Sequence, residues 1–173
     1  MASYYYLISS LPEISSDGEA PVTYDEFLLM CESNISEKKY EYLKNLTLDS
    51  EDGPIMKDWG EFYRNLTSEL NAQRSAILGK AYTKDYDKDS VNAQIAQSAI
   101  NAKNPLEAEK MLLAYQFDAI DTLIGLHSFD DVYLFGYAIK LKLLERQSCF
   151  VKSKGTEEFH RLFETVQQGV YSL

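Results

Sequence analysis

The sequence has few of the residues from which metal sites, disulfide scaffolds and histidine-based catalysis are built. Its 173 residues include only two cysteines and two histidines. Cys31 and Cys149 share no metal-ligand spacing, so we interpret them as free thiols in a reducing compartment. A phosphate-binding glycine-rich loop, a serine nucleophile elbow and a CxxC pair are also missing. We therefore expect a protein that is not an enzyme and has no catalytic residue, cofactor or metal.

The sequence also has no uninterrupted apolar run long enough to cross a membrane. The most apolar stretch, residues 128–147, contains six charged residues. These charges fall within the roughly 20 residues that a bilayer requires, which excludes a transmembrane helix there. The N-terminus has neither the basic start nor the long apolar core of a signal peptide. We expect a cytoplasmic protein without direct membrane insertion.

Basic residues are in the minority, with 17 Lys and Arg against 27 Asp and Glu and a net charge of -10. Residues 128–173 contain six basic and six acidic residues, so all the net acidity belongs to the first 127. An acidic surface repels phosphate backbones and anionic lipid, and we therefore expect no nucleic-acid binding. The one basic segment either complements the dipole of its own helix or contacts an acidic protein partner. Its residues are Lys140, Lys142, Arg146, Lys152 and Lys154.

Two short patterns approach metal-binding motifs but lack essential ligands. Residues 85–89 (DYDKD) begin like a calcium loop, yet Ser90 and Ala96 replace the glycine and the bidentate glutamate that the loop needs. Glu157 and His160 have the spacing of half a di-iron site, without a second half. We interpret the first pattern as a solvated connection and the histidines as surface residues.

Helical periodicity and helix-capping signals are abundant. The composition, with 45% hydrophobic and 25% charged residues, is typical of a globular protein. No pair of segments has the turn chemistry of a β-hairpin, and the pattern predicts one all-α domain over residues 1–173, with about seven helices packed as hairpins or a bundle. Residues 4–11 are either a short extended segment or a buried helix, because eight residues cannot separate the two. The first of the other predicted helices begins after Thr23, with Glu26 completing a capping box. Ser90 and Asn104 (with Glu107) are the predicted caps of two later helices. The remaining predicted helices are 37–46, 55–77, 90–102, 105–125 (with a break near Gln116), 128–147 and 157–168.

The predicted helix at 128–147 has apolar residues around most of its circumference, which indicates a helix enclosed by other elements. We expect Phe135 to be buried in it. Ser128, with Asp131 three residues later, predicts a capping box at its start. The basic residues near its end complement the negative end of the helix dipole. We interpret it as the central core helix.

Tyrosine is frequent, with 13 residues, and Tyr4, Tyr5 and Tyr6 are consecutive. A tyrosine buries its ring and keeps a polar tip, so it suits both packed cores and contact surfaces. Core packing explains most of them. The N-terminal run is also a candidate aromatic contact with a partner protein.

Two parts of the sequence resemble a known family. The first is SYYYLISSLP at 3–12 with PVTYDEFLLMC at 21–31, and the second is LIGLHSFDDVYLFGYAIKLKLLERQSCF at 123–150 with GTEEFHRLF at 155–163. They resemble an uncharacterised bacterial family encoded beside V-type (archaeal-type) ATP synthase genes. That family is similar to the C-type coupling component of the same machine, which corresponds to the d-type component of the eukaryotic enzyme.

This resemblance implies an all-helical, non-catalytic accessory or coupling subunit of a machine for proton or sodium transport. Such a subunit links the soluble central stalk to the membrane ring, so other V-type ATPase subunits would be its partners at the inner membrane. The archaeal C-type component is roughly twice as long and consists of three similar helical bundles, so this chain corresponds to part of it. The alternative is a cytosolic helical adaptor unrelated to the ATPase.

Overall fold

The computed structural model describes residues 4–148 and 161–164, and this part of the chain is all-α without a strand. Residues 161–164 are helical, within the predicted helix at 157–168; the rest of that helix and Cys149 lie outside the described residues. The seven longer helices are α1 (Tyr5–Ser10), α2 (Tyr24–Glu32), α3 (Glu37–Lys44), α4 (Met56–Ile77), α5 (Ser90–Ile100), α6 (Pro105–Ile124) and α7 (Asp131–Ser148).

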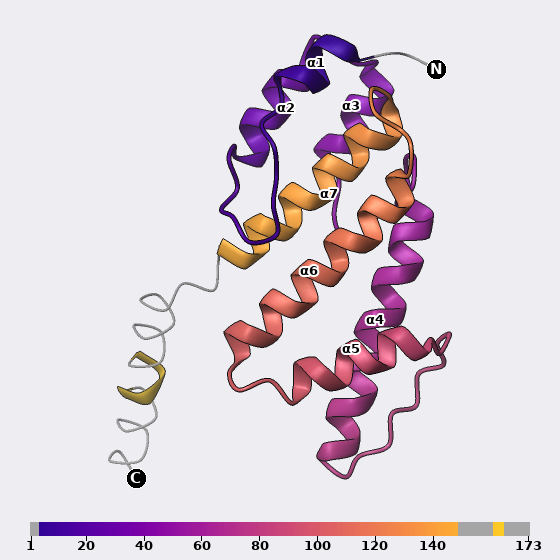
Figure 1. The fold of residues 1–173 in the computed structure, drawn as a ribbon, viewed down its shortest axis with the longest axis vertical. Helices are drawn as coiled ribbons and strands as arrows, with labels where there is room; N and C mark the ends of the chain where they lie inside the picture. Colours follow the sequence, from indigo (N-terminus) through magenta and orange to yellow (C-terminus); the bar gives the residue numbers. More distant parts are fainter. Residues whose placement is uncertain (1–3, 149–160, 165–173) are drawn as a thin grey trace.

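Helix α7 lies in the middle of one half of the molecule (Figure 1). Helices α1, α2 and α3 surround it on one side, and α6 runs beside it on the other. Helix α4 lies next to α6 and extends into the second half, where α5 crosses it. Consecutive helices from α4 to α7 pack against one another, and α2 packs against both α3 and α7. The predicted central position of residues 128–147 is confirmed.

Helix α1 resolves the ambiguity of residues 4–11, because Tyr5–Ser10 is helical. The extended alternative was wrong. The Ile8 amide donates to the Tyr4 carbonyl, and the helix turns Leu7 and Ile8 into the core while Tyr6 remains exposed. The burial of Leu7 and Ile8 on one side of this turn therefore favours the helix over the extended conformation.

The start of α7 differs from the prediction. The helix begins at Asp131, and its cap is Asp130, whose Oδ1 accepts hydrogen bonds from the amides of Val132 (3.1 Å) and Tyr133 (3.3 Å). Ser128 is too far upstream to reach these amides. Burial alone would raise the pKa of Asp130, but the hydrogen bonds from His127 and from the two amides outweigh it and lower the pKa.

Two predicted helix starts are confirmed by their caps. Thr23 and Glu26 form a reciprocal capping box at the start of α2. Asn104 accepts a hydrogen bond from the Glu107 amide at the start of α6. In both cases a side-chain oxygen satisfies an amide that has no partner within the helix.

Two other expectations about helix boundaries were wrong. Helix α5 is capped by Asp89, which accepts from the Val91 amide, while Ser90 is already its first residue. Helix α6 continues without a break through Gln116. Gln116 of α6 is only 6% exposed and lines a pocket. The polar residue in this apolar stretch therefore lies beside a pocket and does not end the helix.

The described residues form two hydrophobic clusters. The major core joins α1, α2, α3, the start of α4, the end of α6 and α7, and it contains the fully buried side chains of Trp59, Phe27 and Phe135. The predicted burial of Phe135 is confirmed. The minor core joins α4, α5 and the start of α6. Its buried members are small or aliphatic: Leu66, Leu70, Ala96, Ala99 and Leu112.

Helices α6 and α7 approach closely at Gly136. A Cβ atom added there would lie 2.5 Å from Ile124 Cδ1 and 3.3 Å from Ile120 Cγ2. The missing side chain at Gly136 therefore makes room for two isoleucines of α6 in the major core. None of the helices in the described part of the chain is long and apolar enough to cross a bilayer.

Candidate functional site

The predicted basic residues of α7 all contact neighbouring helices. Lys140 Nζ lies 2.6 Å from Asp121 Oδ1 on α6 and 5.2 Å from the centre of the Phe117 ring. Lys142 Nζ lies 3.6 Å from the centre of the Tyr24 ring on α2. Cations over aromatic faces are stabilised by the ring quadrupole, so both lysines contribute to helix packing.

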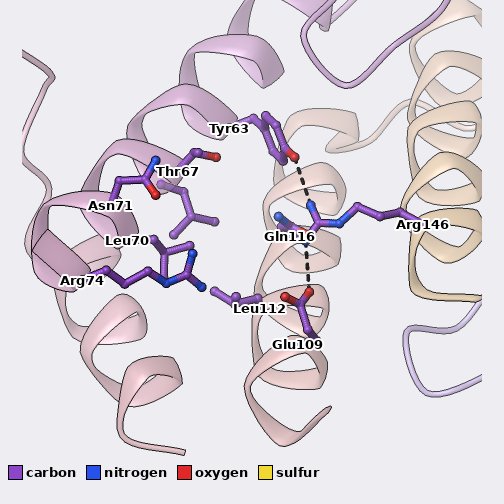
Figure 2. A pocket seen from close by; sticks show the side chains of 10 residues that line it. Tyr63, Thr67, Leu70, Asn71, Arg74, Glu109, Leu112, Gln116 and Arg146 are labelled. Atoms are coloured by element: carbon purple, nitrogen blue, oxygen red, sulfur yellow. Dashed lines mark hydrogen bonds and ion pairs between the residues drawn. The ribbon is translucent and has the colours of Figure 1, made fainter. Parts of the chain in front are cut away.

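Arg146 connects α7 with α4 and α6. Its guanidinium donates to the Tyr63 hydroxyl of α4 and to Glu109 Oε2 of α6, each at 3.0 Å (Figure 2). Lys140, Lys142 and Arg146 are therefore directed toward three different neighbours and do not form one free basic surface. Lys152 and Lys154 lie outside the described residues. A contact between the basic segment and an acidic partner stays a prediction.

The three N-terminal tyrosines have different environments. Tyr4 is buried, and its hydroxyl accepts a hydrogen bond from Lys39 Nζ at 3.2 Å. Tyr5 and Tyr6 are exposed at 55% and 88%. Two of the three predicted contact residues, Tyr5 and Tyr6, therefore lie at the surface, and the third, Tyr4, lies in the core.

An aromatic patch, consisting of Tyr5, Tyr6 and Phe129, lies on the surface at this end of the molecule. The Tyr5 ring packs edge-on against Tyr6 and lies 4.8 Å, centroid to centroid, from the ring of Phe129. Phe129 was not predicted as a contact residue, because its apolar surroundings in the sequence indicated the core helix. In the structure it precedes α7, where its carbonyl accepts a hydrogen bond from the Tyr4 amide at 2.8 Å.

The N-terminal segment and α7 are joined by hydrogen bonds between residues far apart in the sequence. The Tyr24 amide, at the first turn of α2, donates to Glu145 Oε1 at 3.0 Å. The Tyr137 hydroxyl donates to the Pro12 carbonyl at 3.0 Å, which fixes the connection between α1 and α2. These bonds fix α2 and the α1–α2 connection against the surface of α7.

The thiol of Cys31 and the phenol groups of Tyr24 and Tyr137 are buried in the major core. Burial raises the pKa of the Cys31 thiol to about 12 and that of Tyr137 to about 12. Burial also raises the pKa of Tyr24. A thiol held protonated is a poor nucleophile, so Cys31 is a core residue at neutral pH. These groups stabilise packing and are unsuited to proton transfer.

The calcium-like segment has a structural role. Tyr86 donates to the buried carboxylate of Glu69 at 2.8 Å, and Asp89 caps α5, so the connection from α4 to α5 is attached at both points. His127 pairs with Asp130 at the start of α7. Within residues 4–148 and 161–164, there is no group of three or more His, Cys, Asp or Glu side chains that could hold a metal ion.

A polar pocket of about 120 Å³ lies between α4, α6 and α7 (Figure 2). Arg74 reaches toward it from α4, and Arg146 extends from α7 toward α6 on the opposite side. Gln116 lies between them on α6, and Glu109 lies to one side of it. Of these residues, the sequence indicated only Arg146 as a candidate. The others come from separate helices and carry no local motif.

Comparison with protein-family models, with curated proteins and with solved structures found no match. The resemblance to the V-type ATPase family therefore depends on the two segments of the sequence alone.

Proposed function

We propose that the chain is a non-catalytic accessory or C-like coupling subunit of a V-type ATPase or ATP synthase. Its role is to connect the soluble central stalk with the membrane ring through protein contacts. It would reside in the cytoplasm, attached to the inner membrane only through the other subunits of the complex.

The observation that carries this proposal is the packing of the two segments that resemble the family. Residues 3–12 and 21–31 lie more than 90 residues before residues 123–150 in the sequence, yet α1 and α2 pack on α7. The Tyr4 amide bonds to the carbonyl of Phe129, and Phe27 packs against Tyr137 with ring centroids 5.5 Å apart. The described residues of α1, α2 and α7 in these segments thus belong to one structural unit, which supports the proposal of a family that shares a fold.

A binding role suits the chemistry of this unit better than a catalytic one. Its buried thiol and phenols have raised pKa values, and several of its lysines and carboxylates are paired between helices. The three side chains of the aromatic patch are exposed. Aromatic side chains are enriched at protein interfaces because they bury large areas at low entropic cost. We therefore assign the patch to contact with a stalk subunit.

Co-sedimentation tests the proposal. The purified chain is mixed with membranes that carry the assembled ATPase, with the same membranes stripped of the soluble stalk, and with protein-free anionic liposomes. We expect binding to the first preparation only, because an acidic exterior offers no attraction to anionic lipid. Equal binding to all three preparations would exclude the coupling-subunit role.

A pair of variants tests the assigned contact. Tyr5→Ser combined with Tyr6→Ser removes the two most exposed rings of the aromatic patch, while Leu78→Ser removes a side chain exposed at 70% in the other half of the molecule. We expect the double variant to bind the ATPase membranes at least about tenfold more weakly, since interface aromatics each contribute more than ~1 kcal/mol. The Leu78 variant should bind normally. Binding to another helical partner, with none to the ATPase, would favour the adaptor alternative.

A further inference from the structure

The polar pocket between α4, α6 and α7 has a built interior that the proposed function does not use. Gln116 is 6% exposed and lines the pocket, yet its side-chain amide has no hydrogen-bond partner within the described part of the chain. Among the buried side-chain polar atoms of the described residues, only Asp131 Oδ1 lacks a partner, so the Gln116 amide is in contact with the solvent in the pocket. A ligand that enters the pocket can therefore form hydrogen bonds with this amide in place of water.

Arg146 is held in position for a ligand. Its bonds to Tyr63 and Glu109 occupy one N–H of each terminal nitrogen and fix the plane of the guanidinium. Further donors remain on the same group. A guanidinium whose geometry is fixed before binding loses less entropy when it forms a bidentate contact.

Arg74 supplies the second cation of the pocket. It lies on the last turn of α4 and has no partner among the described residues. The remaining polar lining residues are Thr67 and Asn71 of α4, and neither side chain is hydrogen-bonded to another described residue. Two guanidinium groups, two amides and a hydroxyl provide donors for the oxygens of an anion.

The charge of the lining selects among anions. Arg74 and Arg146 contribute two positive charges and Glu109 one negative charge, so a single negative charge neutralises the pocket. A phosphate dianion would leave an excess charge beside Glu109. We propose that this pocket binds a carboxylate group, with Arg74 and Arg146 as ion partners and Gln116 as a hydrogen-bond donor.

The space around the pocket is compatible with two sources of the carboxylate. The pocket volume of about 120 Å³ accommodates a carboxylate with a few attached carbons. A neighbouring hollow of about 320 Å³ between α4, α5 and α6 shares Arg74 and Glu109 with it. A free small carboxylate would fill the pocket alone, whereas an acidic side chain of a bound protein segment would leave its backbone in the hollow.

Titration of the isotope-labelled full-length chain with sodium acetate tests the proposal, with sodium chloride at equal ionic strength as reference. This inference does not depend on attachment to an ATPase, since it is measured on the isolated protein. We expect saturable NMR shifts of the Gln116 side-chain amide and of the Arg74 and Arg146 Nε–H groups. Inorganic phosphate should bind more weakly. Shifts that chloride reproduces, or tighter binding of phosphate, would overturn the proposal.

Three variants locate the site. Arg74→Gln should weaken acetate binding about tenfold, because it removes a charge-assisted hydrogen bond. Arg64→Gln is the matched control on the same helix, where the exposed Arg64 pairs with Glu51, and it should leave acetate binding unchanged. Gln116→Met should weaken binding without changing the charge. Equal weakening by Arg64→Gln and Arg74→Gln would show that acetate senses only the general charge and would contradict a defined site.

Two short peptides distinguish the source of the carboxylate. They are identical except that one has a glutamate where the other has a glutamine. Tighter binding of the glutamate peptide than of acetate would assign the pocket to an acidic protein segment, and similar affinities would assign it to free carboxylates. Thermal unfolding of each variant confirms that the fold is kept. If Arg74→Gln unfolds, Gln116→Met tests the same pocket without altering a charge.

Discussion

The half of the molecule around α7 and the half around α5 are stabilised by different kinds of buried side chain. The major core around α7 contains large aromatic side chains, including Trp59 and Phe135. The minor core around α5 consists of leucines and alanines. All three polar residues buried in the described part of the chain lie on the helices of the minor core: Glu69, Asn92 and Gln116.

This difference shows where binding chemistry can be accommodated. Large apolar side chains fill the major core, and the polar groups around it serve as links between helices. The alanines of α5 allow close helix approach but bury little area, and buried amides beside them need partners. The polar pocket lies where the minor core meets α7, because Leu66, Leu70 and Leu112 line it together with Arg146.

Truncation of one large side chain in each half should show the difference between the two cores most clearly. Phe135→Ala should reduce the free energy of unfolding by about 3–5 kcal/mol, and Leu66→Ala, in the minor core, by about 2–3 kcal/mol. Both side chains are fully buried. Lys142→Ala, on the same helix as Phe135 but partly exposed, is the control and should have a far smaller effect. Urea denaturation measures all three. Equal losses for Phe135 and Lys142 would mean that the buried face of α7 is wrongly assigned.

Overpacking should also distinguish a filled core from open surface. Gly136→Ala places a methyl group against Ile124 and Ile120, and we expect a loss of about 1–3 kcal/mol. Gly18→Ala is the control, because its added Cβ would meet Ser15 at 3.6 Å, an ordinary contact. Differential scanning calorimetry of both variants checks the difference. A neutral Gly136→Ala would show that α6 and α7 can separate without loss.

The parts of the fold that the sequence predicted correctly are those specified by local chemistry. The Thr23–Glu26 and Asn104–Glu107 spacings mark helix starts because the capping bonds form within four residues. The caps at Asp89 and Asp130 were missed because a serine stands one or two positions away in each case. Capping spacing alone cannot decide between adjacent oxygen acceptors when the helix boundary is set by tertiary packing.

The site was less predictable because its contacts are between distant residues. Arg146 was identified as a candidate from its charge, but its partners Tyr63 and Glu109 lie 83 and 37 residues away. Gln116 was taken as a helix break, since a polar residue in an apolar stretch has no local sign of a pocket. Burial next to a cavity is a property of the assembled helices.

The buried polar residues of the minor core should respond to substitution according to whether they have partners. Asn92 Oδ1 accepts a hydrogen bond from the Tyr115 hydroxyl at 2.8 Å, so Asn92→Leu leaves that hydroxyl unpaired and should reduce stability by about 1–2 kcal/mol. Gln116→Met, which removes an amide with no partner among the described residues, should be nearly neutral in the absence of ligand. Chemical denaturation of the two variants measures the contrast. A large loss for Gln116→Met would reveal a partner for Gln116 in the ligand-free protein.

The smallest expected difference concerns the helix caps of the two halves. Thr23→Ala, beside the major core, and Asn104→Ala, beside the minor core, should each reduce stability by about 0.5–1 kcal/mol, because each leaves an N-terminal amide without its acceptor. The two caps differ in their response to acid. Glu26 accepts hydrogen bonds from both the amide and the hydroxyl of Thr23, which lowers the pKa of Glu26 below its usual value of 4.5.

A lowered pKa in the folded state means that the unfolded chain binds the Glu26 proton more readily. The stabilisation by the Thr23–Glu26 pair is therefore complete above pH 4.5 and is lost as the pH falls through the lowered pKa. We expect the effect of Thr23→Ala on the free energy of unfolding to shrink over this range. The Asn104 amide does not titrate, so the effect of Asn104→Ala should stay constant. Urea denaturation of both variants at neutral and acidic pH makes the comparison, and a parallel decline for both would attribute the acid response to general charge repulsion instead of the capping box.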